Sequence, residues 1–186
     1  MTDPEKIKKQ IEICILAGGL SLRMGRDKSK LRLGGKTLLG QIRRTAKTLR
    51  LPVRTLRRDL VPRCGPLGGI YTALKTTTAE SILFLACDMP GVSGALLKAL
   101  LRRSENGSKS VFISANGIAG FPFLLQRGDL PTVENLLAAK QFSLQALARK
   151  TRAKKFRPGR VFQSELLNVN TPADWIELKN VFAKKN

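Results

Sequence analysis

A glycine-rich, basic segment directly after a short apolar run constrains the fold of this chain more than any other feature. The apolar run, Ile11–Leu16, has the length and composition of a buried strand. It is followed by the paired glycines Gly18 and Gly19, and then by the cations Arg23 and Lys28. Because glycine has no side chain, backbone N–H groups in such a turn approach phosphate oxygens closely, and fixed cations neutralise the oxygens. The segment therefore predicts a polyphosphate site at the end of a strand. Its glycine spacing matches neither a Walker A loop nor a Rossmann fingerprint.

Beyond this segment, apolar runs alternate with amphipathic stretches, which is typical of an α/β fold. No repeat or Pro/Ser-rich linker divides the 186 residues, so we expect one domain over 1–186. We predict a Rossmann-like, doubly wound, mostly parallel sheet with helices on both faces and the ligand at the carboxyl ends of the strands. The predicted strands are 11–16, 53–56, 82–86, 111–114, 121–125 and 166–169, with a weaker one at 153–156. The predicted helices are 37–49, 68–75, 93–103, 130–139, 143–149 and 172–182.

The composition excludes several other kinds of site. The chain has no histidine, which excludes a histidine-based catalytic triad and any histidine metal site. Its cysteines, Cys14, Cys64 and Cys87, are widely spaced and form no C-x-x-C pair, which argues against a disulfide framework or a zinc site. Cys14 lies in the strand-like run and is predicted to be a small core residue. No apolar run approaches the roughly 20 residues that cross a bilayer, and the first residues are charged, so we expect a cytoplasmic protein.

The net charge of +21 favours anionic partners such as a nucleotide or a phosphorylated substrate. Fourteen basic residues and two acids fall between Arg23 and Arg63, the region that contains the glycine-rich segment. A second basic stretch, 149–160, contains one aromatic residue, Phe156. It therefore lacks the series of stacking side chains that a single-strand nucleic-acid binder uses, and nucleic acid is not the expected partner.

Residues 16–31 read LAGGLSLRMGRDKSKL and match the pattern L-A-G-G-x-S-x-R-M-G-x-D-K-x-x-L. By this pattern the chain resembles the MobA-like nucleotidyltransferases, whose fold is of the nucleotide-diphospho-sugar transferase type. The resemblance implies that Lys28 contacts the nucleotide phosphates and that Arg23 stabilises charge on the α-phosphate or on pyrophosphate. It also implies that base and phosphates contact the backbone of Leu16, Ala17, Gly18 and Gly19.

A second block, 59–71, reads DLVPRCGPLGGIY and resembles the family's G-P-L-x-G turn, which opens a helix beside the nucleotide base. The resemblance places Gly65, Pro66 and Leu67 at the base. It also gives Asp59 the position of an acidic residue that lies near guanine. The chain departs from the family before this point, because it runs from the preceding helix into Asp59 without the usual additional strand and its asparagine.

Two further blocks resemble the family's magnesium ligands. Residues 84–90, FLACDMP, match C-D-x-P, whose aspartate binds magnesium, so Asp88 is the expected carboxylate ligand. Residues 167–175, LNVNTPADW, match N-x-N-T-P-x-D, where Asn170 is our first choice as an amide ligand and Asn168 the alternative. In the same block, Thr171 and Asp174 are predicted to cap the last helix.

A departure concerns the segment 117–148, which we expect to face the acceptor. Here the chain has Gly120-Phe121-Pro122 where the family often has G-x-x-H-P, so Phe121 replaces a histidine.

Within the family, the chain most resembles the members that make the guanine dinucleotide form of the molybdenum cofactor. This implies magnesium-dependent transfer of GMP from GTP to the terminal phosphate of molybdenum-bearing molybdopterin, with Lys28, Arg23 and Asp88 as catalytic residues. It also implies transient contact with molybdoenzymes or cofactor-insertion proteins. Cytidylyl transfer to the same cofactor and nucleotidyl transfer to a sugar phosphate remain open. So does a non-catalytic basic domain that binds nucleotide or nucleic acid.

Overall fold

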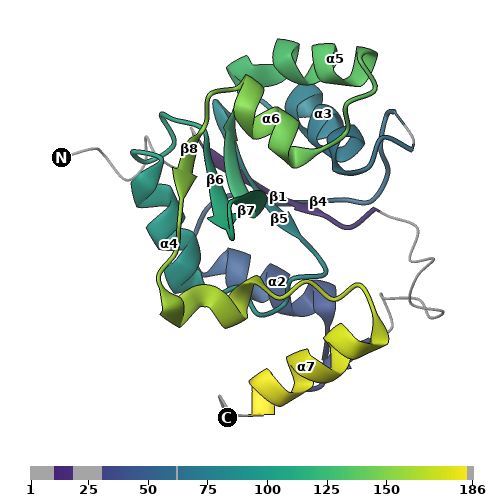
Figure 1. Cartoon of the computed structure of the whole chain (residues 1–186), viewed down its shortest axis with the longest axis vertical. Helices are drawn as coiled ribbons and strands as arrows, with labels where there is room; N and C mark the ends of the chain where they lie inside the picture. Colours follow the sequence, from purple (N-terminus) through teal and green to yellow (C-terminus); the bar gives the residue numbers. More distant parts are fainter. Residues whose placement is uncertain (1–10, 19–30, 62, 184–186) are drawn as a thin grey trace.

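A computed structural model describes residues 11–18, 31–61 and 63–183 of the chain (Figure 1). Its centre is a six-stranded sheet in the order β4-β1-β5-β7-β6-β8. β1 pairs in parallel with β4 and β5, and β6 pairs in parallel with β8. β7 is antiparallel to both of its neighbours, β5 and β6. The strands are β4 (Val53–Leu56), β1 (Ile11–Leu16), β5 (Ser81–Ala86), β7 (Ile118–Gln126), β6 (Val111–Ala115) and β8 (Lys154–Phe156).

Helices cover both faces of this sheet (Figure 1). On one face, α3, α5 and α6 pack against strand residues such as Cys14 and Phe84. On the other face, α2 and α4 pack against Ile13, Ile15 and Leu83. The arrangement confirms the predicted fold class, a mostly parallel sheet between two layers of helices. The helices are α2 (Leu38–Lys47), α3 (Pro66–Thr76), α4 (Gly94–Arg103), α5 (Leu130–Ala138), α6 (Leu144–Lys150) and α7 (Pro172–Ala183).

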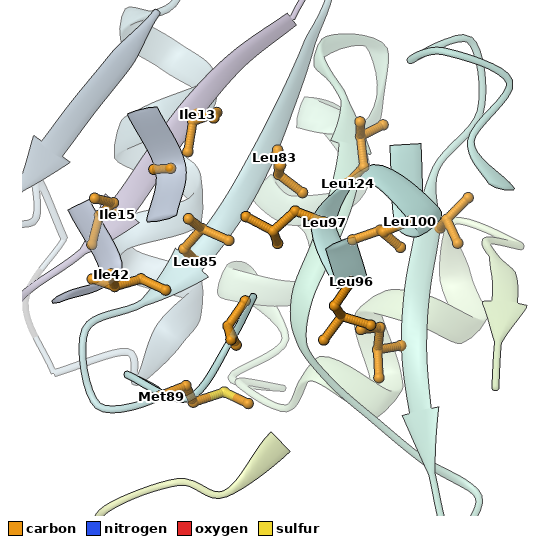
Figure 2. Packing of buried hydrophobic residues seen from close by; sticks show 14 of the residues in the cluster. Ile13, Ile15, Ile42, Leu83, Leu85, Met89, Leu96, Leu97, Leu100 and Leu124 are labelled. Atoms are coloured by element: carbon orange, nitrogen blue, oxygen red, sulfur yellow. The ribbon is translucent and has the colours of Figure 1, made fainter. Parts of the chain in front are cut away.

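The two cores follow from the alternation of side chains along the strands. Ile13 and Ile15 point to the α2–α4 face, where they meet Ile42 and Leu97 (Figure 2). Cys14, between them in the sequence, points to the opposite face, as the period of two in a strand requires. Burial raises the pKa of the Cys14 thiol to about 12. This thiol is therefore an inert core group, as predicted, rather than a nucleophile.

Hydroxyl side chains cap the starts of four helices, among them the predicted cap of α7. The side chains of Thr37, Ser93 and Ser143 each accept a hydrogen bond from a backbone N–H in the first turn of α2, α4 and α6. α7 begins with Pro172, and the hydroxyl of Thr171 accepts a hydrogen bond from the Asp174 N–H. Each such cap stabilises a helix by about 1 kcal/mol.

The strand predicted at 166–169 is wrong. Residues Arg160–Leu166 form a 3₁₀ helix, and the chain then runs to α7 without joining the sheet. Leu166 packs against the α2–α4 core, whereas Val169 joins a small separate cluster with Leu33 and Leu178. The apolar residues of this segment are thus covered by side-chain contacts, and no ladder of backbone hydrogen bonds is needed to bury them.

A short hairpin before α2 was not predicted. It pairs β2 (Arg32–Leu33) with β3 (Lys36–Thr37). Its turn residues Gly34 and Gly35 have φ angles of +54° and +77°, a region that glycine enters without steric cost. α7 packs near this hairpin, because Leu178 and Leu33 share the small cluster. Across the described ranges, no helix combines the length and apolarity that a bilayer crossing needs.

Candidate active site

A cleft of about 730 Å³ opens at the carboxyl ends of β4, β1 and β5. The last residues of these strands, Leu56, Leu16 and Ala86, form its floor. Ligands of open α/β sheets bind at this edge, because the loops that leave the strands gather there. The predicted ligand edge of the sheet therefore carries a cleft.

The start of α3 forms one wall of the cleft, and its glycines allow another loop to rest on it. A Cβ atom added at Gly68 would lie 2.5 Å from the carbonyl oxygen of Val61 and 3.1 Å from Oδ2 of Asp59. The backbone N–H of Leu60 also donates to Oγ1 of Thr72, at 2.8 Å. The loop after β4 is thus fastened onto the first turns of α3. Asp59 thus reaches the cleft from the loop that follows β4.

The side chain of Asp59 lies close to Gly18, which follows β1, and to Gly69 in the first turn of α3. Cβ atoms added at Gly18 and Gly69 would lie 3.8 Å and 3.3 Å from its Oδ1 atom. Burial raises the pKa of Asp59 above its ordinary value of 3.8. A partly desolvated carboxylate beside a helix start, in a cleft with glycine walls, is a strong acceptor for donors on a planar ligand.

Asp88 and Asn168 line the same cleft. Asp88 is the second residue after β5, and its carbonyl oxygen accepts a hydrogen bond of 2.9 Å from the Val169 N–H. This bond holds the C-terminal segment against the loop after β5. Carboxylate and amide oxygens are the donors that Mg²⁺ prefers, so the side chains of Asp88 and Asn168 fit a magnesium ion.

Asn170, our first choice as the amide ligand, is not among the residues that line this cleft. Its backbone N–H and that of Thr171 both donate to Oδ2 of Asp174, each at 2.8 Å. The backbone of Asn170 therefore belongs to the start of α7, whereas the alternative, Asn168, lines the cleft together with Asp88.

The other predicted nucleotide contacts divide into three groups. Gly65 and Pro66 line the cleft, as do Leu16 and Gly18. Ala17 does not line the cleft, and the Leu67 side chain is fully buried in the core on the face that α3, α5 and α6 cover. Gly19, Arg23 and Lys28 lie outside the described residues.

Sequence reasoning did not single out Arg57 and Arg63, two charged residues that line the cleft. Arg57 is the residue directly after β4, so its position after a predicted strand was a usable signal. Phe121, which lies in the segment expected to face the acceptor, also lines the cleft, and its ring centre is 5.0 Å from that of Phe123. The two arginines give the cleft the positive charge that a phosphorylated ligand requires.

We compared the chain with known proteins. Residues 13–155 match the family model of the MobA-like NTP transferase domain. A probable molybdenum cofactor guanylyltransferase of Carboxydothermus hydrogenoformans is 30% identical, and the match covers 95% of this chain and 99% of that protein. A probable molybdenum cofactor guanylyltransferase of Opitutus terrae is 33% identical, with 86% of this chain and 90% of that protein covered.

A solved structure of similar fold is molybdopterin-guanine dinucleotide biosynthesis protein A from Archaeoglobus fulgidus. Its TM-score is 0.70 at 19% sequence identity, and the match covers 93% of this chain and 99% of that one. At this identity the likeness concerns the fold. The family model covers most of the chain, and the relative from Carboxydothermus hydrogenoformans is covered almost end to end. The chain therefore belongs to the MobA-like NTP transferase family.

Proposed function

We propose that this protein transfers GMP from GTP to the terminal phosphate of molybdenum-bearing molybdopterin and releases pyrophosphate. The observation that carries the proposal is that one cleft is lined both by Asp59, which lies beside the glycines of α3, and by Asp88 and Asn168. The first group is suited to a base and the second to metal-bound phosphates. Relatives named molybdenum cofactor guanylyltransferase support the choice of nucleotide and acceptor.

Asp59 would read the base. Its carboxylate offers two acceptor oxygens, which match the N1–H and the exocyclic amino group of guanine. Adenine presents a lone pair at N1 and would face the carboxylate with acceptor against acceptor. A site built to hydrogen-bond one edge of a base rejects a wrong edge strongly, because its own polar groups would be left unpaired.

The other end of the cleft would hold the phosphates. Lys28 and Arg23 of the family signature would neutralise phosphate charge, and Asp88 and Asn168 would hold a magnesium ion through their oxygens. The bound ion would polarise the phosphate oxygens and offset the negative charge that develops on them. An oxygen of the acceptor phosphate then attacks the α-phosphorus of GTP. The bond between the α-phosphorus and the bridging oxygen breaks, and pyrophosphate leaves with the electron pair. The protein contributes mainly positioning and charge.

Room for the acceptor is present beside the nucleotide cleft. A second cavity of about 640 Å³ is lined by the turn between β6 and β7 and by Arg157, Gln163 and Leu167. Leu167 and Asn168 are adjacent in the chain, so neighbouring residues of the segment that leads to α7 line the two cavities. An acceptor in this cavity would direct its phosphate toward Asp88 and Asn168.

A turnover assay tests the proposal. Purified protein is incubated with magnesium, molybdopterin bearing molybdenum, and GTP, CTP, ATP or UTP, and both pyrophosphate and the dinucleotide product are measured. We expect GTP to be used ahead of CTP and well ahead of ATP. A preference for CTP would reassign the protein to cytidylyl transfer. Turnover with glucose 1-phosphate alone would indicate a sugar-phosphate enzyme, and nucleotide binding without product in any mixture would contradict catalysis.

A further inference from the structure

The segment between β8 and α7 carries Asn168 into the cleft but is not part of the sheet. Its position cannot come from a strand ladder, so it must come from individual contacts. Besides the hydrogen bond from the Val169 N–H to the Asp88 carbonyl, a side-chain hydrogen bond ties this segment to the loop after β5. The Ser93 N–H donates to Oε2 of Glu165 at 2.9 Å.

Glu165 completes the N-terminal cap of α4 from a distant part of the chain. In a capping box, the first residue's hydroxyl accepts from the N–H three residues on, and a Glu or Gln at that third position reaches back to the first residue's N–H. Ser93 supplies the first half, since its hydroxyl accepts from the Leu96 N–H at 3.1 Å. Leu96 cannot supply the second half, because its side chain has no acceptor. Glu165, 72 residues further along the chain, accepts from the Ser93 N–H instead.

The setting of Glu165 shows that this contact is specific. Its residue surface is only 7% exposed, and a buried carboxylate is costly unless donors and a favourable dipole meet it. The start of α4 offers both, because its N–H groups and its dipole favour negative charge. The backbones also approach closely, since a Cβ atom added at Gly91 would lie 3.5 Å from Cα of Glu165.

We infer that Glu165 is a positioning residue for the proposed active site. It fastens the segment that bears Asn168 to the loop that bears Asp88, and so sets the separation of the two oxygen donors. Ser93 is five residues beyond Asp88, and Asn168 is three residues beyond Glu165, so the tie lies next to both donors. The inference rests on the proposed function, because it assigns Glu165 a role toward metal-bound nucleotide.

The test compares three variants with the wild type. Glu165→Ala removes the acceptor, Glu165→Gln keeps an acceptor oxygen at the same reach, and Glu177→Ala removes an exposed acid of α7 as a control. Nucleotide affinity is measured by calorimetry with magnesium and with a chelator, using whichever nucleotide the wild type binds best. Unfolding temperature and product formation are measured alongside. The fluorescence of Trp175, the single tryptophan of the chain, reports on the start of α7.

We expect Glu165→Ala to lose about tenfold in magnesium-dependent affinity, the size of one lost charge-assisted hydrogen bond, while its affinity in chelator stays near the wild-type value. The turnover of Glu165→Ala should fall by at least the same factor, and its Trp175 emission should shift. Glu165→Gln should recover most of the lost affinity. Glu177→Ala should resemble the wild type. A merely structural cap would lower the unfolding temperature and weaken binding equally with and without magnesium, which would overturn the inference.

Two further outcomes separate this inference from the proposed function. If the nucleotide affinity of the wild type does not depend on magnesium, the role of Glu165 is overturned. The proposed transferase activity would then still be decided by the product assay. A wild type that binds magnesium-nucleotide without forming product would overturn the proposed function. The ratio of Glu165→Ala to wild-type affinity would still decide the positioning role.

Discussion

At the scale of single residues, Asp59 combines two opposing demands. Its carboxylate must be ionised to accept hydrogen bonds from a base, yet burial raises its pKa because the charged form loses hydration. The ionised form therefore lowers the stability of the fold at pH values above the folded-state pKa. Below the ordinary value of 3.8 the carboxylate is protonated in both folded and unfolded states, and this cost disappears.

Replacing the carboxylate by an amide separates these demands. We expect Asp59→Asn to unfold at a higher temperature than the wild type near neutral pH, and this gain to vanish as the pH falls through the raised pKa. The same variant should lose its preference for GTP over ATP, because an amide offers one acceptor and a competing donor. Thermal unfolding between about pH 4 and pH 8, with calorimetry of four nucleotides, measures both effects. An unchanged nucleotide ranking would mean that the base is read elsewhere, with the backbone of residues 16–19 as the first alternative.

Asp88 is the residue on which the chemistry should depend most. We expect Asp88→Asn to lower turnover by about 10²-fold or more, as for the loss of one preorganised charged contact, with little change in unfolding temperature because the volume is kept. A magnesium titration of product formation checks this. Asp129→Asn is the matched control, since Asp129 lies beyond the far end of β7, where it accepts a hydrogen bond from Ser110. Equal turnover in the two variants would remove Asp88 from the mechanism.

At the scale of elements, the site is built where strands end and helices begin. β4, β1 and β5 are parallel and end at one edge of the sheet. The residues that follow these strands therefore lie near one another, although they are far apart in the sequence. α3 then brings its first turn against the loop after β4, and α4 brings its capped start against the C-terminal segment. The elements therefore act as a frame, and the loops carry the chemistry.

The close approach at α3 gives a prediction at this scale. In Gly68→Ala the new Cβ would meet the Val61 carbonyl oxygen at 2.5 Å, so the loop that carries Asp59 must move away. We expect a loss of stability of about 1–3 kcal/mol, as in other overpacked sites, and a loss of turnover of about 10²-fold, as for a displacement near 1 Å. Denaturant unfolding and GTP turnover measure the two effects.

Gly128→Ala is the control for this prediction. A Cβ atom added at Gly128 would meet nothing within 4 Å, and Gly128 lies in the short 3₁₀ helix after β7. It should leave both stability and turnover close to wild type. Wild-type turnover in Gly68→Ala would show that the position of the Asp59 loop does not matter to the reaction.

At the scale of the whole molecule, the net charge of +21 is a source of self-repulsion. Helices α2 and α4 illustrate this excess of positive charge, because neither contains an acidic residue and each ends in basic residues. Like charges spread over a compact surface destabilise it, and they also attract anions without specificity.

Salt should therefore stabilise this protein. Raising sodium chloride from about 20 mM to about 200 mM shortens the screening length from roughly 20 Å to below 10 Å. We expect the unfolding temperature to rise over this range in the absence of nucleotide, while nucleotide affinity falls because the cleft cations are screened. Scanning fluorimetry and calorimetry over the same salt series measure the two trends. A falling unfolding temperature would show that attractive ion pairs, such as Glu12 with Arg54, outweigh the repulsion.

The features that local sequence determined are those that depend on neighbours along the chain. The apolar run 11–16 predicted the bounds of β1, Thr171 and Asp174 predicted the cap of α7, and the order of strand and aspartate placed Asp88 at the ligand edge. Period and capping chemistry are carried by residues within a few positions of one another. The family signature added the expected chemistry of the cleft, and membership in the family is confirmed.

The tertiary structure alone decided the features that depend on contacts between distant segments. It placed Asn168 in the cleft that Asp88 also lines, whereas the backbone N–H of Asn170 joins the cap of α7. It kept 166–169 out of the sheet and packed Leu166 and Val169 into side-chain clusters instead. It also completed the cap of α4 with Glu165. Each outcome rests on which surfaces meet after folding, and the periodicity of one segment contains no information about the partner it will find.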